Sequence, residues 1–171
     1  MAAKTQTKAC SYVVGDDGLA SWSDTHKDAW IGLLETHKRL TRALEAELEA
    51  DFGLSLSGVE VLGRLAAAEG HNLRLSVLAG ECGLSLSRIS RIIDTLEARK
   101  LVARRPSADD ARAVEAHLLT AGLDLVRKAQ SRHFEGVQQR FFEQLDDAEI
   151  QMLADVFGRF APRAAAACTE S

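Results

Sequence analysis

The sequence lacks the features that mark membrane-spanning and secreted proteins. No apolar run approaches the roughly 18 residues of a membrane span, and the first residues, MAAKTQTKAC, lack the apolar core of a signal peptide. A cytoplasmic protein without a membrane partner is therefore expected. Aromatic residues make up only 5% of the chain, whereas alanine, leucine, glutamate and arginine abound. This composition predicts a mainly helical protein.

Cysteine and histidine are too sparse to predict a disulfide framework or a metal centre. Cys10, Cys82 and Cys168 are odd in number, widely spaced and form no CxxC pair. The five histidines are scattered without an HxxxH pair, so no cofactor is predicted, although a metal site assembled across subunits stays open. Cys82 should be a buried small hydrophobe. Whether Cys10 or Cys168 is redox-active stays open, because nothing near either of them clearly lowers its pKa.

The charge pattern favours binding of an anion over catalysis. No nucleophile–base pair, paired carboxylate motif or phosphate loop can be found, so the chain is not expected to be an enzyme. The net charge of the whole chain is −4. Residues 71–112, however, hold eight basic and five acidic side chains, a net charge of +3, against −7 for the remainder. A basic segment inside an acidic frame indicates a localised face for nucleic acid.

Residues 76–94, SVLAGECGLSLSRISRIID, predict two short helices joined by a tight turn. Gly83 stands where the turn requires a positive φ, which glycine adopts without a Cβ clash. Ser76 should cap the first helix and Ser85 the second. The pattern is that of a helix-turn-helix, whose second helix enters the major groove of DNA.

The predicted second helix separates an apolar face from a polar one. Its apolar stripe consists of Ile89, Ile92, Ile93 and Leu96. At about 100° per residue, Ser87 and Arg91 point almost opposite that stripe, with Arg88 and Ser90 at their flanks. A surface helix could carry such residues for solubility alone, so the neighbouring segments must decide.

A hairpin is predicted directly after this helix. Residues 101–105 and 113–119 have strand patterns and are separated by PSADDAR, which is rich in turn formers. A short extended segment at residues 73–75 should pair with them. Arg112 at the tip would reach into the minor groove, held extended by a carboxylate such as that of Asp110. The alternative is an ordinary charged turn.

The segment before this module predicts a long helix followed by a shorter one. Residues 24–51 carry an apolar stripe at helical spacing. Gly53 should end this helix. A capping box formed by Ser57 and Glu60 should then begin the next helix.

Two more helices are predicted after the hairpin. Thr120 should cap a helix that runs to about Leu145, and Asp146 with Glu149 should cap another that Pro162 ends. The long helices have more apolar surface than a small lobe can cover, which predicts a homodimer. The expected organisation is a flexible arm at residues 1–23, helical dimerisation regions at 24–52 and 121–165, and a winged helix-turn-helix lobe at 54–120.

Several segments resemble one family of bacterial repressors, the multiple antibiotic resistance regulator (MarR) family. They are LSLSGVEVL, LAGECGLSLSRISRIIDTLEARKLVARR, DDAR and LLTAGL. The resemblance covers about residues 28–160. It implies a two-fold dimer of winged lobes on a pseudo-palindromic operator, with small phenolic or aromatic acids often lowering the affinity. The family usually has glycine where this chain has Lys100, and a left-handed residue there would cost roughly 1 kcal/mol.

The leading hypothesis is therefore a dimeric, sequence-specific DNA-binding regulator of transcription, either a repressor or an activator. Side chains expected in the major groove are those of Ser85, Ser87, Arg88, Ser90 and Arg91. Arg104 and Arg105 would hold phosphates, while Asp110 and Arg112 would serve the wing. Trp30, His37 and Arg39 are the candidates for a small aromatic effector, although His37 also fits an ordinary interface histidine. A winged-helix module that docks protein without binding DNA is the alternative, because fold alone does not decide function.

Overall fold

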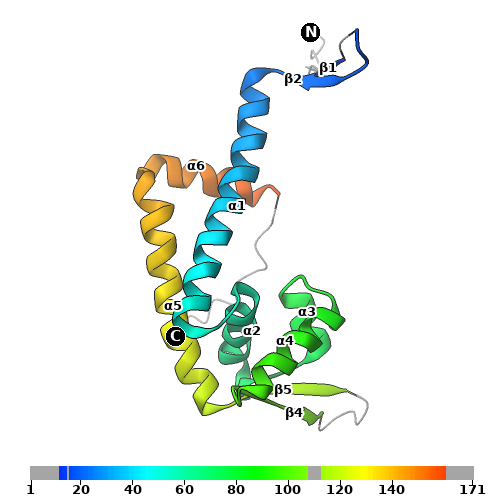
Figure 1. Ribbon diagram of the computed structural model, residues 1–171, viewed down its shortest axis with the longest axis vertical. Helices are drawn as coiled ribbons and strands as arrows, with labels where there is room; N and C mark the ends of the chain where they lie inside the picture. Colours follow the sequence, from blue (N-terminus) through cyan, green and yellow to red (C-terminus); the bar gives the residue numbers. More distant parts are fainter. Residues whose placement is uncertain (1–11, 15, 108–112, 161–171) are drawn as a thin grey trace, which may run out of the picture. The chain divides into compact units, whose positions relative to one another are not determined.

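The computed structural model describes residues 12–14, 16–107 and 113–160. Two compact units, residues 1–42 and 43–171, are treated separately below. The helices are α1 (Asp24–Phe52), α2 (Leu56–Ala67), α3 (Leu75–Glu81), α4 (Leu86–Ala98), α5 (Thr120–Arg140) and α6 (Asp147–Gly158) (Figure 1). The strands are β1 (Tyr12–Val14), β2 (Ala20–Trp22), β3 (Asn72–Arg74), β4 (Val102–Pro106) and β5 (Val114–Leu118). This mainly helical chain with small antiparallel sheets confirms the predicted fold class.

The first unit holds a hairpin and the N-terminal part of α1. Strands β1 and β2 pair antiparallel, with Tyr12 opposite Trp22. Gly18 takes a positive φ in the turn, and the Leu19 N–H donates to the Asp17 carboxylate at 2.9 Å, as is common in turns. Sequence patterning did not predict this hairpin, because its strands are only three residues long. The extent of α1, in contrast, matches the prediction closely.

The second unit is built around one apolar core. It joins α2, α3, α4 and α5 to a sheet with strand order β3-β5-β4. Side chains that are at most 2% exposed include Leu62, Leu65, Leu78, Ile89, Ile93, Leu96, Val102 and Val126. Each large aliphatic side chain buried this way contributes about 1.5–3 kcal/mol. Gly122 near the start of α5 belongs to this packing, since a Cβ there would collide with the Leu101 carbonyl oxygen.

Helix α5 is also fixed to the C-terminal end of α1 by ion pairs. Arg132 lies 3.2 Å from the Glu47 carboxylate and 3.0 Å from that of Asp51. Arg140 pairs with the second Glu47 oxygen. These contacts hold α5, which follows the wing in the chain, against the end of α1 within the second unit.

Three predicted N-caps are wrong. Helix α2 begins after Ser55, whose hydroxyl accepts from the Gly58 N–H at 3.1 Å, so Ser57 lies inside the helix and does not form the expected box. Helix α3 begins at Leu75, directly after β3, so Ser76 is not its cap. Thr120 is the first residue of α5, and the residue before it is tied to the sheet instead, by a backbone bond to Leu101.

The predicted start of α6 is confirmed, whereas the predicted end of α5 is wrong. The capping box of Asp146 and Glu149 is present, with bonds of 2.8 and 2.9 Å, as predicted. Helix α5 ends at Arg140 rather than near Leu145, because Phe141 leaves the helical conformation and a short 3-10 turn follows. None of the helices in the described ranges has both the length and the apolarity needed to cross a membrane.

Candidate nucleic-acid interface

Helices α3 and α4 form a helix-turn-helix, as predicted (Figure 1). Gly83 has φ +62° in the turn. The Gly83 N–H donates to the Gly80 carbonyl and the Leu84 N–H to the Ala79 carbonyl, at 3.2 and 2.9 Å. These bonds close the C-terminus of α3 around a left-handed glycine. Ala79 is buried where the two helices approach, and this small side chain permits the close packing.

Helix α4 presents its two faces as the spacing predicted. The Ser85 hydroxyl caps it by accepting from the Arg88 N–H at 3.3 Å. Ile89 and Ile93 are fully buried in the core. On the opposite side, Ser85, Ser87, Arg88 and Arg91 are all exposed. The first two turns of α4 therefore offer hydroxyls and guanidinium groups to the surroundings.

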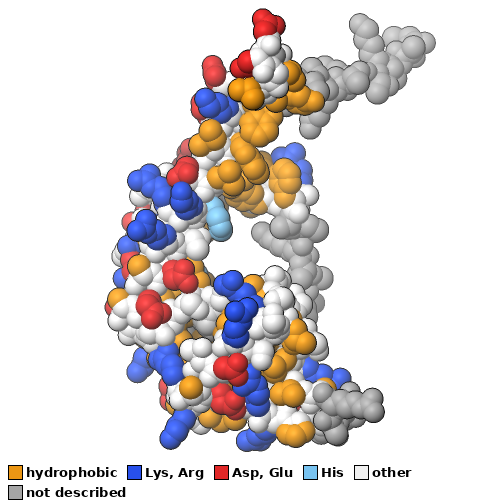
Figure 2. All heavy atoms as spheres, turned by 45° about the vertical axis from the view of Figure 1, so that its right-hand side comes forward, with side chains coloured by type: hydrophobic (Ala, Val, Ile, Leu, Met, Phe, Trp, Pro, Cys, Tyr) orange, Lys and Arg blue, Asp and Glu red, His pale blue; other side chains and the backbone are white. Residues whose placement is uncertain are grey.

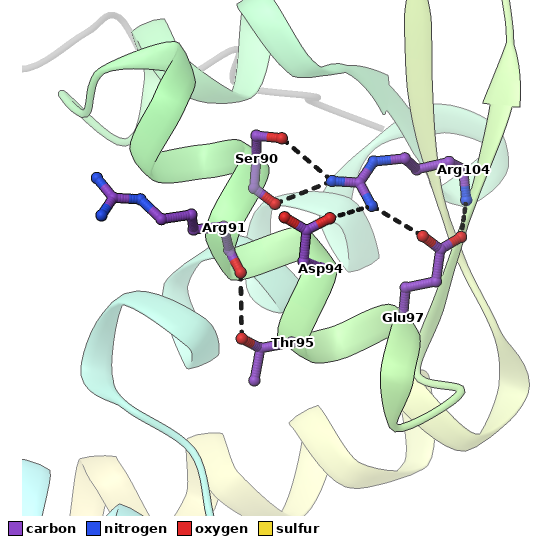
Figure 3. A network of polar contacts seen from close by, with 6 residues as sticks. All are labelled: Ser90, Arg91, Asp94, Thr95, Glu97 and Arg104. Carbon is purple, nitrogen blue, oxygen red and sulfur yellow. Dashed lines mark hydrogen bonds and ion pairs between the residues drawn. The ribbon is translucent and has the colours of Figure 1, made fainter.

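Arg104, which was predicted to hold a phosphate, has a side chain that contacts helix α4. Its side chain, on β4, reaches back to α4 and is only 24% exposed (Figure 3). One terminal nitrogen lies 2.7 Å from the Asp94 carboxylate and 2.8 Å from that of Glu97. The other donates to the backbone carbonyl and the hydroxyl of Ser90, at 2.9 and 3.2 Å. This set of contacts is called the α4–β4 brace below.

The α4–β4 brace involves two residues that were expected to contact DNA. Both terminal nitrogens of Arg104 are engaged within the protein. Ser90 is half-buried, and its hydroxyl accepts from Arg104 and so turns toward the wing. The backbone N–H of Arg104, and then its guanidinium, lower the pKa of Glu97 below the usual carboxyl range. The brace joins strand β4 to helix α4.

Two other arginines are free to contact a ligand. No hydrogen bond or ion pair engages the side chains of Arg88 or Arg105 within residues 12–14, 16–107 and 113–160. The side chain of Arg91 makes one long contact of 3.4 Å, from its Nε to the Ser87 carbonyl. All three are exposed. Their guanidinium groups are exposed positive charges near the brace.

The wing pairs β4 with β5, from Val102 opposite Leu118 to Pro106 opposite Val114. Beyond this register, the Ser107 N–H donates to the Ala113 carbonyl at 2.9 Å. The other edge of β5 pairs with β3, as predicted. The predicted wing-tip residues Asp110 and Arg112 lie outside the described residues.

Comparison with known proteins identifies the family. A model of the MarR family matches residues 52–113. The crystal structure of AbsC, a MarR family transcriptional regulator from Streptomyces coelicolor, is 32% identical; the match covers 82% of this chain and 94% of AbsC, with a TM-score of 0.77. The chain belongs to the MarR family of transcriptional regulators.

Two further solved structures share the fold. Sco3205 from Streptomyces coelicolor, in complex with DNA, has 24% identity and a TM-score of 0.77 over 82% of this chain and 88% of its own. The MepR–DNA complex from S. aureus has 21% identity and a TM-score of 0.66 over 82% and 97%. Among curated proteins, no relative matches the chain.

Lys100 is where this MarR-family chain departs from the usual glycine. It has φ +59°, the left-handed conformation that the resemblance implied. The Lys100 and Leu101 N–H groups donate to the Glu97 and Leu96 carbonyls at 2.8 and 3.0 Å, which closes the end of α4. The helix thus ends as it would with glycine, at the cost of placing a lysine side chain in a strained backbone region.

Sequence reasoning missed the hydrogen bonds that Arg99 makes to the end of α1. Its guanidinium donates to the Gly53 carbonyl at 2.6 Å and to the Phe52 carbonyl at 2.8 Å. It thereby satisfies carbonyls at the end of α1, which have no partner within that helix. An arginine at the C-terminal end of a helix is too common for the sequence alone to indicate this role. Arg99 connects the end of α1 to the end of α4.

The residues predicted for an effector lie on α1 in the first unit. Trp30, His37 and Arg39 are all exposed, and Trp30 packs edge-to-face against Trp22 with ring centroids 6.3 Å apart. Within the described ranges, no group of three histidine, cysteine or acidic side chains is placed to hold a metal ion.

Cys82 differs from the expectation of full burial. It lies half-buried against the core. Burial and then the charge of Glu60 raise the pKa of its thiol, which keeps it protonated and unreactive near neutral pH. Cys10 and Cys168 lie outside the described residues.

Proposed function

We propose that the protein is a dimeric, sequence-specific DNA-binding repressor that places α4 in the major groove. The observation that carries this proposal is the exposed face of the first two turns of α4, with Ser87, Arg88 and Arg91 on the side away from the buried Ile89 and Ile93. The N-terminal residues of a recognition helix are those that meet base edges. Arginine suits guanine, because its two donors match the O6 and N7 acceptors.

Phosphate contacts would come from strand β4. Arg105 is exposed and has no side-chain partner among the described residues, so it suits a phosphate. Arg104 would act indirectly, by holding β4 at a fixed angle to α4 through the brace. Arg112, with Asp110 beside it, is proposed to reach the minor groove, on the strength of its place in the wing sequence.

A homodimer would cover the apolar side chains that each unit leaves exposed. In the first unit, hydrophobic side chains gather over the hairpin and the N-terminal half of α1 (Figure 2). They include Trp22, Trp30, Ile31, Leu33 and Leu34. In the second unit, Met152 and Phe157 of α6 are exposed. Contiguous exposed apolar surface of this kind marks protein interfaces, and a two-fold dimer would read half-sites about 10 bp apart.

Regulation by a small aromatic effector is the remaining part of the proposal. Trp30, His37 and Arg39 offer an indole, an imidazole and a guanidinium within three turns of α1. An aromatic acid could stack on the indole, or pair its carboxylate with the guanidinium. A panel of aromatic acids screened by thermal shift tests this part, since a ligand that binds only the native state raises Tm.

The test of DNA binding is selection from a random duplex library, followed by affinity measurement. An inverted repeat should be enriched. Arg91→Ala should relax the base preference at one position of each half-site, whereas Arg105→Ala should weaken all duplexes alike and reduce the salt slope by about one per half-site. Failure to bind random duplex even at low salt would refute the proposal and favour a module that docks protein.

A further inference from the structure

Leu86 is an exposed apolar side chain at the start of the proposed recognition helix α4. It is the first residue of α4 and is 54% exposed. The other large aliphatic residues of this helix either belong to the core or pack against it: Ile89, Ile92, Ile93 and Leu96. Core packing therefore accounts for those four and not for Leu86.

The backbone at Leu86 is held firmly. Ser85 before it caps the helix through the Arg88 N–H at 3.3 Å, and the hydroxyls of Ser85 and Ser87 lie 3.1 Å apart. The Ser85 hydroxyl is thus largely used within the helix. Leu86 lies at the end of α4 that the proposed mode of binding inserts deepest into the groove.

The position of Leu86 around the helix indicates which part of a half-site it meets. At about 100° per residue, Leu86 lies between the directions of the buried Ile93 and of Ser90, at the edge of the apolar stripe that borders Ser90. Ser90 is bonded to Arg104 of the wing strand (Figure 3). Leu86 therefore lies on the wing side of α4. Arg91 points to a different side of the groove.

The chemistry of the major groove offers one apolar group that suits such a side chain. Among the four bases only thymine carries a methyl group there, at C5, and apolar side chains contact it. We propose that Leu86 is a specificity-determining residue that contacts a thymine C5-methyl group on the wing side of each half-site. This inference rests on the proposed function and adds to it a base that arginine and serine would not select.

The experiment compares thymine with uracil in the duplex that the wild-type protein enriches from a random library. Uracil pairs as thymine does and lacks only the C5-methyl group. Each thymine of one half-site is replaced in turn, and Kd is measured. At one position, loss of the methyl contact should weaken wild-type binding about fourfold, which corresponds to the burial of one methyl group, about 0.8 kcal/mol. Replacement in both half-sites should weaken it about fifteenfold, if the two contribute independently.

Variants assign the effect to this side chain. Leu86→Ala should bind the thymine and uracil duplexes equally, while Leu86→Met, which keeps an apolar side chain, should retain most of the preference. Val77→Ala removes another exposed aliphatic side chain, on α3, and should keep the full preference. Since Leu86 is largely exposed, its variants should fold normally, which circular dichroism can check.

The outcomes separate this inference from the proposed function. Enrichment of an inverted repeat with no thymine on the wing side, or no effect of uracil at any position, overturns the role of Leu86 and leaves DNA binding intact. An undiminished uracil effect in Leu86→Ala overturns it as well. If the wild-type protein enriches no duplex, the proposed function itself fails.

Discussion

The α4–β4 brace makes a prediction that separates a positioning role for Arg104 from a phosphate contact. Arg104→Ala removes ion pairs of 2.7 and 2.8 Å to Asp94 and Glu97 and two bonds to Ser90. Partly exposed ion pairs contribute about 0.2–1 kcal/mol each, and the hydrogen bonds to Ser90 about 0.5–1.5 kcal/mol each. Because these contributions overlap, a total loss of about 2 kcal/mol is expected. For a chain of this size, Tm should fall by roughly 4–8 °C.

The matched control is Arg105→Ala, which removes the same charge from the next residue. Arg105 has no side-chain partner among the described residues, so its loss should leave Tm nearly unchanged. The salt dependence of DNA binding should respond in the opposite way: Arg105→Ala reduces the slope by about one per half-site and Arg104→Ala does not. Arg104→Lys should rescue little, since lysine cannot reproduce the forked contacts.

The pH dependence follows from the lowered pKa of Glu97. A carboxyl group whose pKa is lower in the folded state stabilises the fold above its unfolded pKa, about 4.3 for glutamate, and loses this effect as pH falls through the folded value. The difference in Tm between wild type and Arg104→Ala should therefore be full at pH 7 and shrink below about pH 4. An unchanged Tm at pH 7, together with a reduced salt slope, would refute the positioning role.

Two further substitutions test the ends of helices. Lys100→Gly should raise stability by up to about 1 kcal/mol, because glycine adopts φ +59° without strain; a lower Tm would mean that the lysine side chain contributes a contact that outweighs this strain. Ser55→Ala should destabilise by about 1 kcal/mol through loss of the α2 cap. Ser57→Ala should have almost no effect, and equal losses in the two variants would contradict the assignment of the cap to Ser55 when followed by urea titration.

Local patterns in the sequence were sufficient to predict the recognition helix and its turn. Glycine is the residue type that readily takes a φ of +62°, as Gly83 does in the turn. The isoleucines of α4 recur at a spacing that leaves one possible buried face. The same holds for the wing strands and for the capping box at Asp146.

Contacts between distant parts of the chain account for what was missed. Ser76 has the chemistry of a cap, but pairing of β3 with β5 keeps the chain extended up to Arg74, and α3 begins two residues earlier than a Ser76 cap requires. Arg104 and Arg105 are indistinguishable in the sequence, and only the closeness of β4 to α4 separates them. A search for periodic apolar residues places Leu86 at the start of the α4 stripe, three residues before Ile89 and seven before Ile93, so the sequence gives no sign that this side chain is exposed.

The α4–β4 brace also limits how this chain can change during evolution. Loss of Arg104 alone would leave Asp94 and Glu97 as two uncompensated negative charges on the face that we propose approaches DNA. Those carboxylates would then repel the phosphate backbone as well as each other. Neutral drift at these positions should therefore proceed in pairs, and descendants that lack the arginine should also lack at least one of the two acids.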